Sequence, residues 1–103
     1  MGKPMRIRAR AQGDVVEVKV LISHIMETGF RKDQEGTLVP AQFIQLITVA
    51  HQGREVLSAQ WGPAISANPY LSFKFRGGRP GETVTVKWID NTGDSRSDET
   101  AIV

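Results

Sequence analysis

Residues 70–90, YLSFKFRGGRPGETVTVKWID, contain two alternating segments on either side of a glycine-rich turn. Within each segment every second side chain is apolar, and the side chains between them are polar. A period of two is typical of a β-strand that buries one face. The stretch therefore predicts two strands, joined by a turn at Gly77–Gly81, that supply the aromatic centre of the core. The expected inward residues are Leu71, Phe73, Phe75, Val84, Val86 and Trp88.

The same alternation occurs near the N-terminus. Residues 5–11 and 15–23 each alternate apolar with polar side chains, and Gln12–Asp14 between them has the composition of a turn. The two segments predict a β-hairpin whose first strand has a basic outer face. That face would carry Arg6, Arg8 and Arg10, whereas the inward side of the second strand would carry Val16, Val18, Val20 and Ile22.

Residues 43–50 form an apolar run in which both faces of the expected strand are mostly hydrophobic. One face would carry Phe43, Ile47 and Val49, and the other Ile44, Leu46 and Ala50. A strand of an antiparallel sandwich packs one face on the core and leaves the other in water. The second apolar face therefore predicts a covering surface, such as a partner protein.

The rest of the chain continues the series of strands. A turn at Gln52–Gly53 leads to a strand at residues 54–61 and a connection at residues 64–69, in which the following proline favours extended geometry at Asn68. A turn at Asn91–Asp94 precedes the tail, where Thr100–Val103 is expected as a short final strand. About seven short strands without helical periodicity predict an all-β, immunoglobulin-like or fibronectin-like antiparallel β-sandwich, with residues 1–103 as one domain.

Composition excludes several classes of function. The net charge is +2, the chain has no cysteine, and the N-terminal residues lack the apolar segment of a secretory signal. Disulfides and thiolate chemistry are therefore excluded, and no apolar run is long enough to span a membrane. Mild basicity gives little support for nucleic-acid binding. If the chain works outside the cytoplasm, we expect it to be matured from a longer form or carried there by a partner.

The polar loop at residues 23–33 is the only stretch whose composition suggests a role in addition to stabilising the fold. Its histidine, His24, has no nearby cysteine or second histidine, so we expect a structural or interface role, and we expect His51 to be exposed. Residues 90–98 lack the glycine and glutamate of a calcium loop, and residues 76–81 lack the Lys-Ser/Thr of a phosphate-binding loop. We therefore predict no catalytic residue, cofactor site or metal site.

Several segments carry a resemblance to a known family. They are HIMETGFRKD at residues 24–33, PAQFI at 40–44, SANP at 66–69 and VKWIDN at 86–91. In this order, within a cysteine-free sandwich of this length, they resemble the SoxZ family of bacterial sulfur oxidation. The family commonly has proline after the histidine, where this chain has Ile25.

The resemblance implies a periplasmic heterodimer with SoxY, which carries a sulfur intermediate covalently on a cysteine in its glycine-rich C-terminal arm. This chain would be the non-catalytic subunit, exported together with SoxY, and would offer docking surface to the enzymes of thiosulfate oxidation. The expected loop contacts are Met26, Glu27, Thr28, Gly29, Arg31 and Asn68. The heterodimer interface would use Ile44 and Leu46 or the opposite face, Phe43 and Ile47, with core packing as the other role open to these four residues.

Two other readings stay open at this point. One is a generic immunoglobulin-like accessory or interaction module of a secreted complex. The other is nucleic-acid binding through the arginines of the first strand, although no exposed aromatic side chains alternate with them. A solvated face, or a surface that steers an acidic partner, fits these arginines better.

Overall fold

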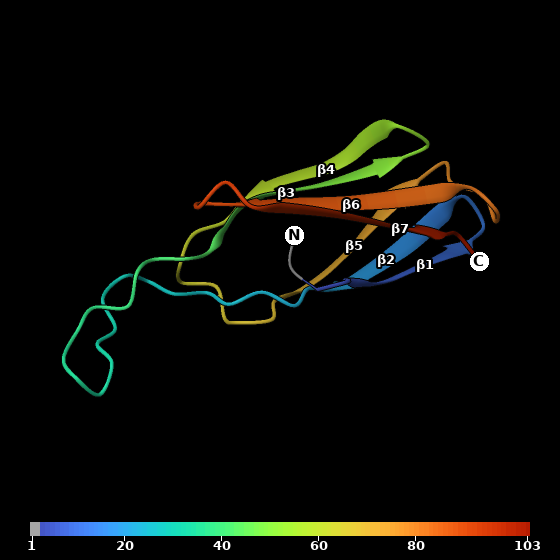
Figure 1. Ribbon diagram of the computed structural model, residues 1–103. Coiled ribbons are helices and arrows are strands. Elements are labelled where there is room, and N and C mark those ends of the chain that lie inside the picture. Colours follow the sequence, from blue (N-terminus) through green and yellow to red (C-terminus); the bar gives the residue numbers. More distant parts are fainter. Residues whose placement is uncertain (1–2) are drawn as a thin grey trace.

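Two antiparallel sheets pack face to face in the computed structural model, which describes residues 3–103 (Figure 1). The three-stranded sheet has the order β1 (Arg6–Gln12), β2 (Val15–Leu21) and β5 (Tyr70–Arg76). The four-stranded sheet has the order β4 (Arg54–Gln60), β3 (Ile44–His51), β6 (Thr83–Asp90) and β7 (Ser95–Ala101). The predicted immunoglobulin-like or fibronectin-like β-sandwich is therefore confirmed.

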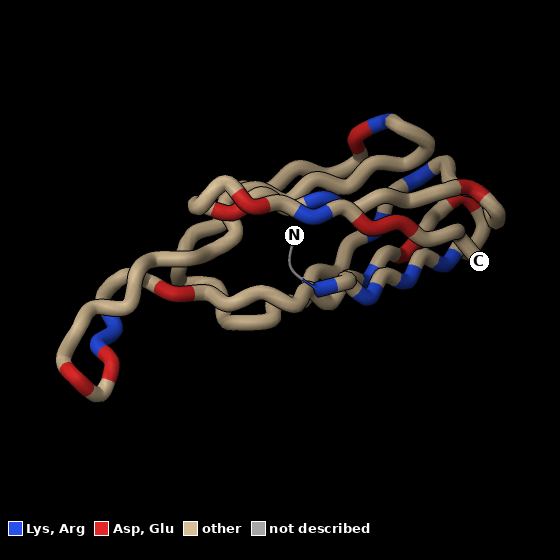
Figure 2. Tube along the Cα trace, viewed as in Figure 1, with Lys and Arg blue, Asp and Glu red and all other residues tan. Residues whose placement is uncertain are grey.

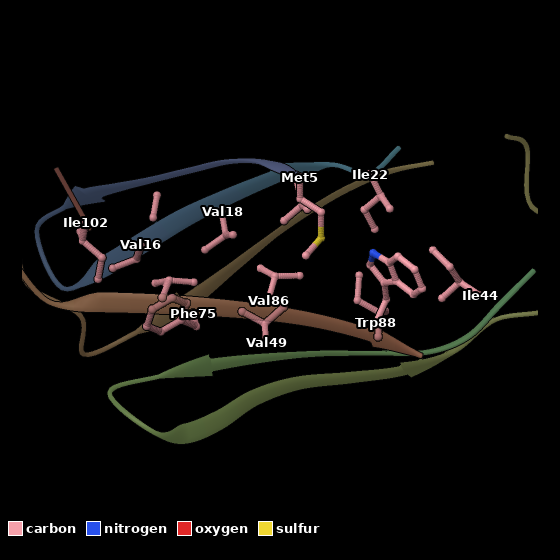
Figure 3. Packing of buried hydrophobic residues seen from close by; sticks show 14 residues of the cluster. Met5, Val16, Val18, Ile22, Ile44, Val49, Phe75, Val86, Trp88 and Ile102 are labelled. Carbon is pink, nitrogen blue, oxygen red and sulfur yellow. The ribbon is translucent and has the colours of Figure 1, made fainter. Parts of the chain in front are cut away.

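The inward side chains of both sheets form a single hydrophobic cluster. Trp88 is completely buried and lies between Ile22 and Ile44 (Figure 3), at the end of the core where β3 begins. The alternation seen in the sequence placed most of the core correctly, because the inward face of β2 and of β6 is inaccessible to solvent. The fully buried residues that it identified are Val16, Val18, Val20, Ile22, Val84, Val86 and Trp88.

A β-bulge changes the side-chain alternation at the start of β3. The pairing with β6 shifts between Ile44 and Leu46. The shift brings Ile44 to the same side as Ile47, and both side chains have 0% exposure. The prediction that they lie on opposite faces is wrong, because a strict period of two does not hold across a bulge. Leu46 stays outside the core, half-buried, so the second apolar face of β3 is smaller than expected.

The glycine-rich connection at Gly77–Gly81 differs from the predicted hairpin turn. It joins β5 to β6, and these strands belong to different sheets, so it crosses from one layer to the other. Gly78 lies at the crossing, where an added Cβ would be 2.5 Å from Val16 Cγ2 and 3.0 Å from Ile102 Cδ1. The close approach of this backbone to the core explains a glycine here without any phosphate-binding role.

The C-terminal strand is longer than predicted. β7 begins directly after the expected turn at residues 91–94 and pairs with β6 from Ser95 to Ala101. Its sequence, SRSDETA, has almost no apolar residue, so hydrophobic alternation could not reveal it. Ile102 follows the strand and is 2% exposed, and Val103 N donates a 2.9 Å hydrogen bond to Ala9 O. The tail thereby links β7 to β1 across the side of the sandwich.

His51 is covered, contrary to the prediction that it is exposed. Its side chain is 15% exposed, and its Nε2 lies 2.9 Å from Glu82 Oε1. The imidazole ring centroid is 5.1 Å from that of Phe75. The hydrogen bond with His51 lowers the pKa of Glu82, assisted by the backbone N–H of Arg79. This hydrogen bond connects the end of β3 to the residue before β6.

We predict that Gly78→Ala lowers the free energy of unfolding by about 1–3 kcal/mol, because the new methyl group overpacks a region bounded by a branched valine. Gly62→Ala is the matched control, since an added Cβ there meets no atom within 4 Å. Its expected effect is within about 0.5 kcal/mol. Urea denaturation of the two variants measures both values, and equal stabilities would contradict the packing argument.

Candidate protein interface

Residues 25–42, here called the projecting loop, connect β2 to β3 and extend from one end of the sandwich (Figure 1). Near its base, Glu27 and Gln42 pair through N–H to carbonyl bonds of 2.6 and 3.0 Å. Further out, Lys32 opposes Leu38 in a second bridge. The molecule measures 54 × 20 × 20 Å along its principal axes, and the loop lies along the longest of them.

A closed turn forms the tip of the projecting loop. Asp33 Oδ1 accepts hydrogen bonds from the backbone N–H groups of Glu35 at 2.9 Å and Thr37 at 3.0 Å. Gly36 has φ 79°, a left-handed conformation that glycine adopts without steric cost. The tip is therefore an Asx-type turn held by its own side chain.

A buried histidine and aspartate hold the base of the loop. His24 Nε2 lies 3.0 Å from Asp90 Oδ2, and the exposed fractions of the two side chains are 5% and 0%. The His24 ring packs edge-on against Trp88, with 4.7 Å between ring centroids, and its Nδ1 donates to Ile25 O. Each ring nitrogen thus faces an acceptor, which supports the structural role predicted for His24.

Asp90 also organises the turn that follows β6. Its Oδ1 accepts hydrogen bonds from Thr92 N at 2.9 Å, Thr92 Oγ1 at 2.7 Å and Asp94 N at 3.0 Å. Burial by itself would raise the pKa of Asp90, but the hydrogen bonds from Thr92, His24 and Asp94 outweigh it and lower the pKa. The residue is therefore held as a carboxylate that joins the turn to His24.

Asn68 adopts a conformation that the sequence argument did not predict. Its φ is 51°, in the left-handed region, whereas extended geometry was expected before Pro69. Asn68 N donates to His24 O at 2.9 Å, and Asn68 Oδ1 accepts from His24 N at 3.2 Å. These two bonds hold asparagine, a residue that tolerates this region, against the preference imposed by proline. Asn68 thereby lies beside the base of the projecting loop.

An ion pair lies on the surface of the projecting loop. Arg31 Nη2 donates to Glu27 Oε1 at 2.7 Å, and Arg31 Nε lies 3.1 Å from both carboxylate oxygens. The hydrogen bond from Arg31 lowers the pKa of Glu27. Because both groups are in contact with water, the pair orders the two side chains more than it stabilises the fold.

Three large apolar side chains on the loop are exposed and were not among the predicted contacts. Phe30 is 85% exposed, Leu38 is 55% exposed and Ile25 is 54% exposed. Gly29, beside Phe30, has φ 88° and would place a Cβ 3.1 Å from Ala41 Cβ, so the loop is tightly folded below the phenylalanine. A phenylalanine within a run of charged residues was the signal in the sequence. Exposed apolar anchors on an ordered support are characteristic of protein interfaces.

The remaining predicted contact residues occupy different environments. Met26 packs partly against the core, and Thr28 Oγ1 accepts a 3.0 Å bond from Phe30 N. Four apolar residues at the start of β3 were expected at the heterodimer interface, and two of them, Ile44 and Ile47, are core residues. Phe43 and Leu46 are half-buried and line a surface pocket of about 380 Å³ together with Gln45, Gln60 and Trp61. A direct contact with a partner is thus open to Phe43 and Leu46.

A second pocket, of about 340 Å³, lies beside the base of the projecting loop. His24, Asn68 and Trp88 line it, and Trp88 Nε1 is buried without a hydrogen-bond partner. Within residues 3–103, no three histidine, aspartate or glutamate side chains come together as a metal site. That part of the chain also contains no helix of the length and hydrophobicity needed to cross a membrane.

Comparison with protein families gives a match over nearly the whole chain. The family model described as "Sulphur oxidation protein SoxZ" matches residues 5–101. The chain belongs to the SoxZ family. The matched residues of this SoxZ-family chain include the whole projecting loop and all seven strands. Among curated proteins, no significant sequence match was found.

Solved structures similar to this SoxZ-family chain share its fold at low sequence identity. The superoxide reductase (neelaredoxin) of Ignicoccus hospitalis has a TM-score of 0.67 and 14% identity, covering 97% of this chain and 79% of its own. A variant of the superoxide reductase of Archaeoglobus fulgidus has a TM-score of 0.62 and 19% identity, with coverages of 97% and 86%. A Pyrococcus horikoshii protein has a TM-score of 0.67 and 16% identity, with coverages of 98% and 88%. At these identities the likeness concerns the fold alone.

We predict that Asp90→Asn lowers the free energy of unfolding at neutral pH by about 1.5–3 kcal/mol, because an amide replaces the carboxylate that accepts from His24. The lowered pKa of Asp90 means that its contribution is complete above the ordinary value, about 3.9, and is lost as pH falls through the folded value. The difference between wild type and variant should therefore shrink below about pH 4. Urea denaturation at neutral and acidic pH measures it.

Asp14→Asn provides the control for this experiment, since Asp14 is an exposed turn residue and its side chain has no hydrogen bond in the part of the chain that the structure describes. It should leave stability within about 0.5 kcal/mol of wild type at both pH values. A variant at position 90 that is equally destabilised at both pH values would show that charge has no part in holding the loop.

Proposed function

We propose that this chain is the non-catalytic subunit of a sulfur-carrier heterodimer in thiosulfate or sulfur oxidation. The family match over residues 5–101 carries the proposal. In the SoxZ-type carrier, a SoxY-like partner holds the sulfur intermediate covalently on a cysteine of its glycine-rich C-terminal arm. Our chain would stabilise that partner and provide docking surface for the enzymes that act on the bound sulfur.

The chemistry of the side chains supports a role without catalysis. The sequence contains no cysteine, so a sulfur intermediate has no thiol to attach to on this subunit. The His24–Asp90 pair resembles an acid–base pair in composition, yet its atoms are engaged in bonds that hold the loop and the turn after β6. An imidazole that is 5% exposed and faces an acceptor at each nitrogen is poorly placed to transfer protons to a substrate.

The projecting loop and the adjoining end of β3 form the surface best suited to the partner. Phe30 and Leu38 supply exposed apolar anchors, and the loop backbone is ordered by its two bridges. Where the loop returns to the sandwich, Phe43 and Leu46 line a pocket of about 380 Å³ with Trp61. An interface that combines protruding anchors with an apolar pocket can bury a continuous apolar centre surrounded by polar residues.

The proposed place of work is the periplasm. A SoxY-like partner that bears an export signal could bring this subunit across the membrane already bound, which requires that the heterodimer forms before export. The heterodimer would then present the partner's C-terminal arm in turn to the pathway enzymes. In this arrangement, the contact of this subunit with those enzymes is brief, whereas its contact with the partner persists.

Co-expression with a SoxY-like chain, that is, one with a glycine-rich tail and a single cysteine, tests the proposal. The expected result is co-elution of the two chains in size-exclusion chromatography and, after incubation with thiosulfate and the pathway enzymes, a sulfur-containing mass increase on the partner alone. If this chain stays monomeric beside the partner, the carrier role is refuted. That outcome would favour a generic accessory module of another complex.

We predict that the double variant Phe30→Ser with Leu38→Ser weakens heterodimer formation about 30-fold, which corresponds to about 2 kcal/mol and is typical of interface anchors. Its fold should be unchanged, because both side chains are exposed in the free subunit. Val103→Ser removes another exposed apolar side chain, 74% exposed, at the opposite end of the sandwich (Figure 1) and should have no effect on binding. Isothermal titration calorimetry measures the affinities, and equal affinities for both variants would contradict the assignment.

The pocket lined by Phe43, Leu46 and Trp61 gives an independent prediction. Leu46→Asp places a charge where the partner would otherwise bury the leucine, so the heterodimer should dissociate while the circular dichroism spectrum of the subunit stays that of wild type. Thr48→Asp, also half-buried on β3, is the control for adding a carboxylate to this strand. A Leu46→Asp heterodimer as stable as that of Thr48→Asp would remove the pocket from the proposed interface.

A further inference from the structure

The outer face of the three-stranded sheet is strongly cationic. All three strands contribute, since the outward positions of β1, β2 and β5 alternate with the buried ones. Figure 2 shows a row of basic residues along β1 at the lower edge of the sandwich. We call this surface the basic face; its charged residues in the described structure are Arg6, Arg8, Arg10, Glu17, Lys19, Lys74 and Arg76.

The basic face has a larger net positive charge than the chain as a whole. Six cations and one carboxylate give the face a net charge of +5, whereas the whole chain, with 13 Lys and Arg and 11 Asp and Glu, has +2. The rest of the chain, with 7 Lys and Arg against 10 Asp and Glu, therefore carries −3. Such a separation of charge orients the molecule as it approaches a charged partner.

Within residues 3–103, the six cations of this face share one carboxylate, Glu17, which lies opposite Arg10 on β1 and Lys74 on β5. Arg31 and Arg96 each form close pairs with a carboxylate, at 2.7 Å in both cases. On the basic face, the ion pair is that of Lys19 with Glu17, at 3.6 Å. Arg8 lies directly opposite Lys19 in the β1–β2 register. Like charges in this position destabilise a sheet, so folding alone does not account for them.

An apolar spot lies within the basic face. Leu21 on β2 and Tyr70 on β5 are directly opposite each other and are 41% and 58% exposed. Together with the side chains of Arg6, Arg8 and Lys19 they line a surface pocket of about 240 Å³. The pocket has the size to receive one apolar side chain, with three cations around it to pair with neighbouring carboxylates.

Protection against edge-to-edge aggregation is the simplest other explanation for charges on a sheet. It accounts for arginines on β1, which is an edge strand. It does not account for Lys19 on the central strand, or for an exposed leucine and tyrosine left between the charges. A surface built only to avoid association would not combine an apolar pocket with unneutralised cations.

We propose that the basic face binds an acidic protein surface in which carboxylates surround one protruding apolar side chain. This face belongs to the three-stranded sheet, whereas Leu46 and its pocket belong to the four-stranded sheet, so the two surfaces lie on different layers of the sandwich. The inference goes beyond the proposed carrier role and does not depend on the identity of the partner at the projecting loop.

The probe for this proposal is a short glutamate-rich peptide with one central leucine, titrated into the ¹⁵N-labelled full-length chain. At low ionic strength the shifted amide signals should lie in β1, β2 and β5, and binding should weaken as salt is added. A peptide with glycine in place of leucine should bind more weakly, because it leaves the pocket at Leu21 and Tyr70 empty.

Charge reversal separates binding from stability. Lys19→Glu should lower the affinity of the chain for the leucine peptide about tenfold, which is a loss of about 1.4 kcal/mol of binding free energy. The same change should leave the thermal stability of the free chain close to that of wild type, because the attraction gained with Arg8 offsets the loss of the Lys19–Glu17 pair. Arg54→Glu, an equal change of charge at an exposed position of β4, should leave peptide binding close to wild type.

Three results would overturn the proposal. The first is no binding at low salt, and the second is a set of shifts spread over both sheets. The third is binding of an oligothymidylate or of anionic phospholipid vesicles as tight as that of the leucine peptide, which would make the face a general polyanion surface. None of these results bears on heterodimer formation, so failure here and failure of the carrier role are distinguishable.

Discussion

The hydrogen bond between buried His24 and Asp90, 3.0 Å long, is the interaction on which the placement of the projecting loop depends. His24 precedes the projecting loop on the side of the three-stranded sheet, and Asp90 ends β6 in the other sheet. The next residue, Asn91, holds the returning end of the loop, since its side chain bonds both Phe43 N at 2.8 Å and Ala41 O at 2.9 Å. Asp90 and Asn91, at one turn, thus fix the two ends of the projecting loop, which has no hydrophobic core of its own.

This anchoring explains how a histidine and an aspartate at the base of the loop can have a structural role. A histidine and an aspartate in the same region suggest a reactive pair when only the sequence is known. In the folded chain their polar atoms are used by Ile25, Thr92, Asp94 and each other. The two side chains therefore hold the loop in place and are not free to react. A subunit whose partner carries the reactive cysteine needs only the first of these roles.

The sequence predicted the strands well, because solvent exclusion imposes a period of two on β2, β5 and β6, although it did not place β5 and β6 in different sheets. It failed where other constraints act. The bulge before Leu46 reverses the alternation, Gly78 is required by contact with distant Val16, and β7 is an edge strand without an apolar pattern. The composition of the loop predicted a contact surface, and this stays a prediction; the exposure of Phe30 and Leu38 depends on how the loop projects, which no local pattern records. The left-handed conformation of Asn68 likewise comes from bonds to His24, far away in sequence.

Hydrogen–deuterium exchange of the chain, alone and in the presence of the proposed cysteine-bearing partner, tests whether the projecting loop is the interface, because it shows which backbone amides become covered. If the loop is the interface, exchange should be slower in residues 25–42 and around Phe43 and Leu46, with the amides of β1 and β5 unchanged. Slower exchange confined to β1, β2 and β5, with the projecting loop exchanging as in the free chain, would contradict it.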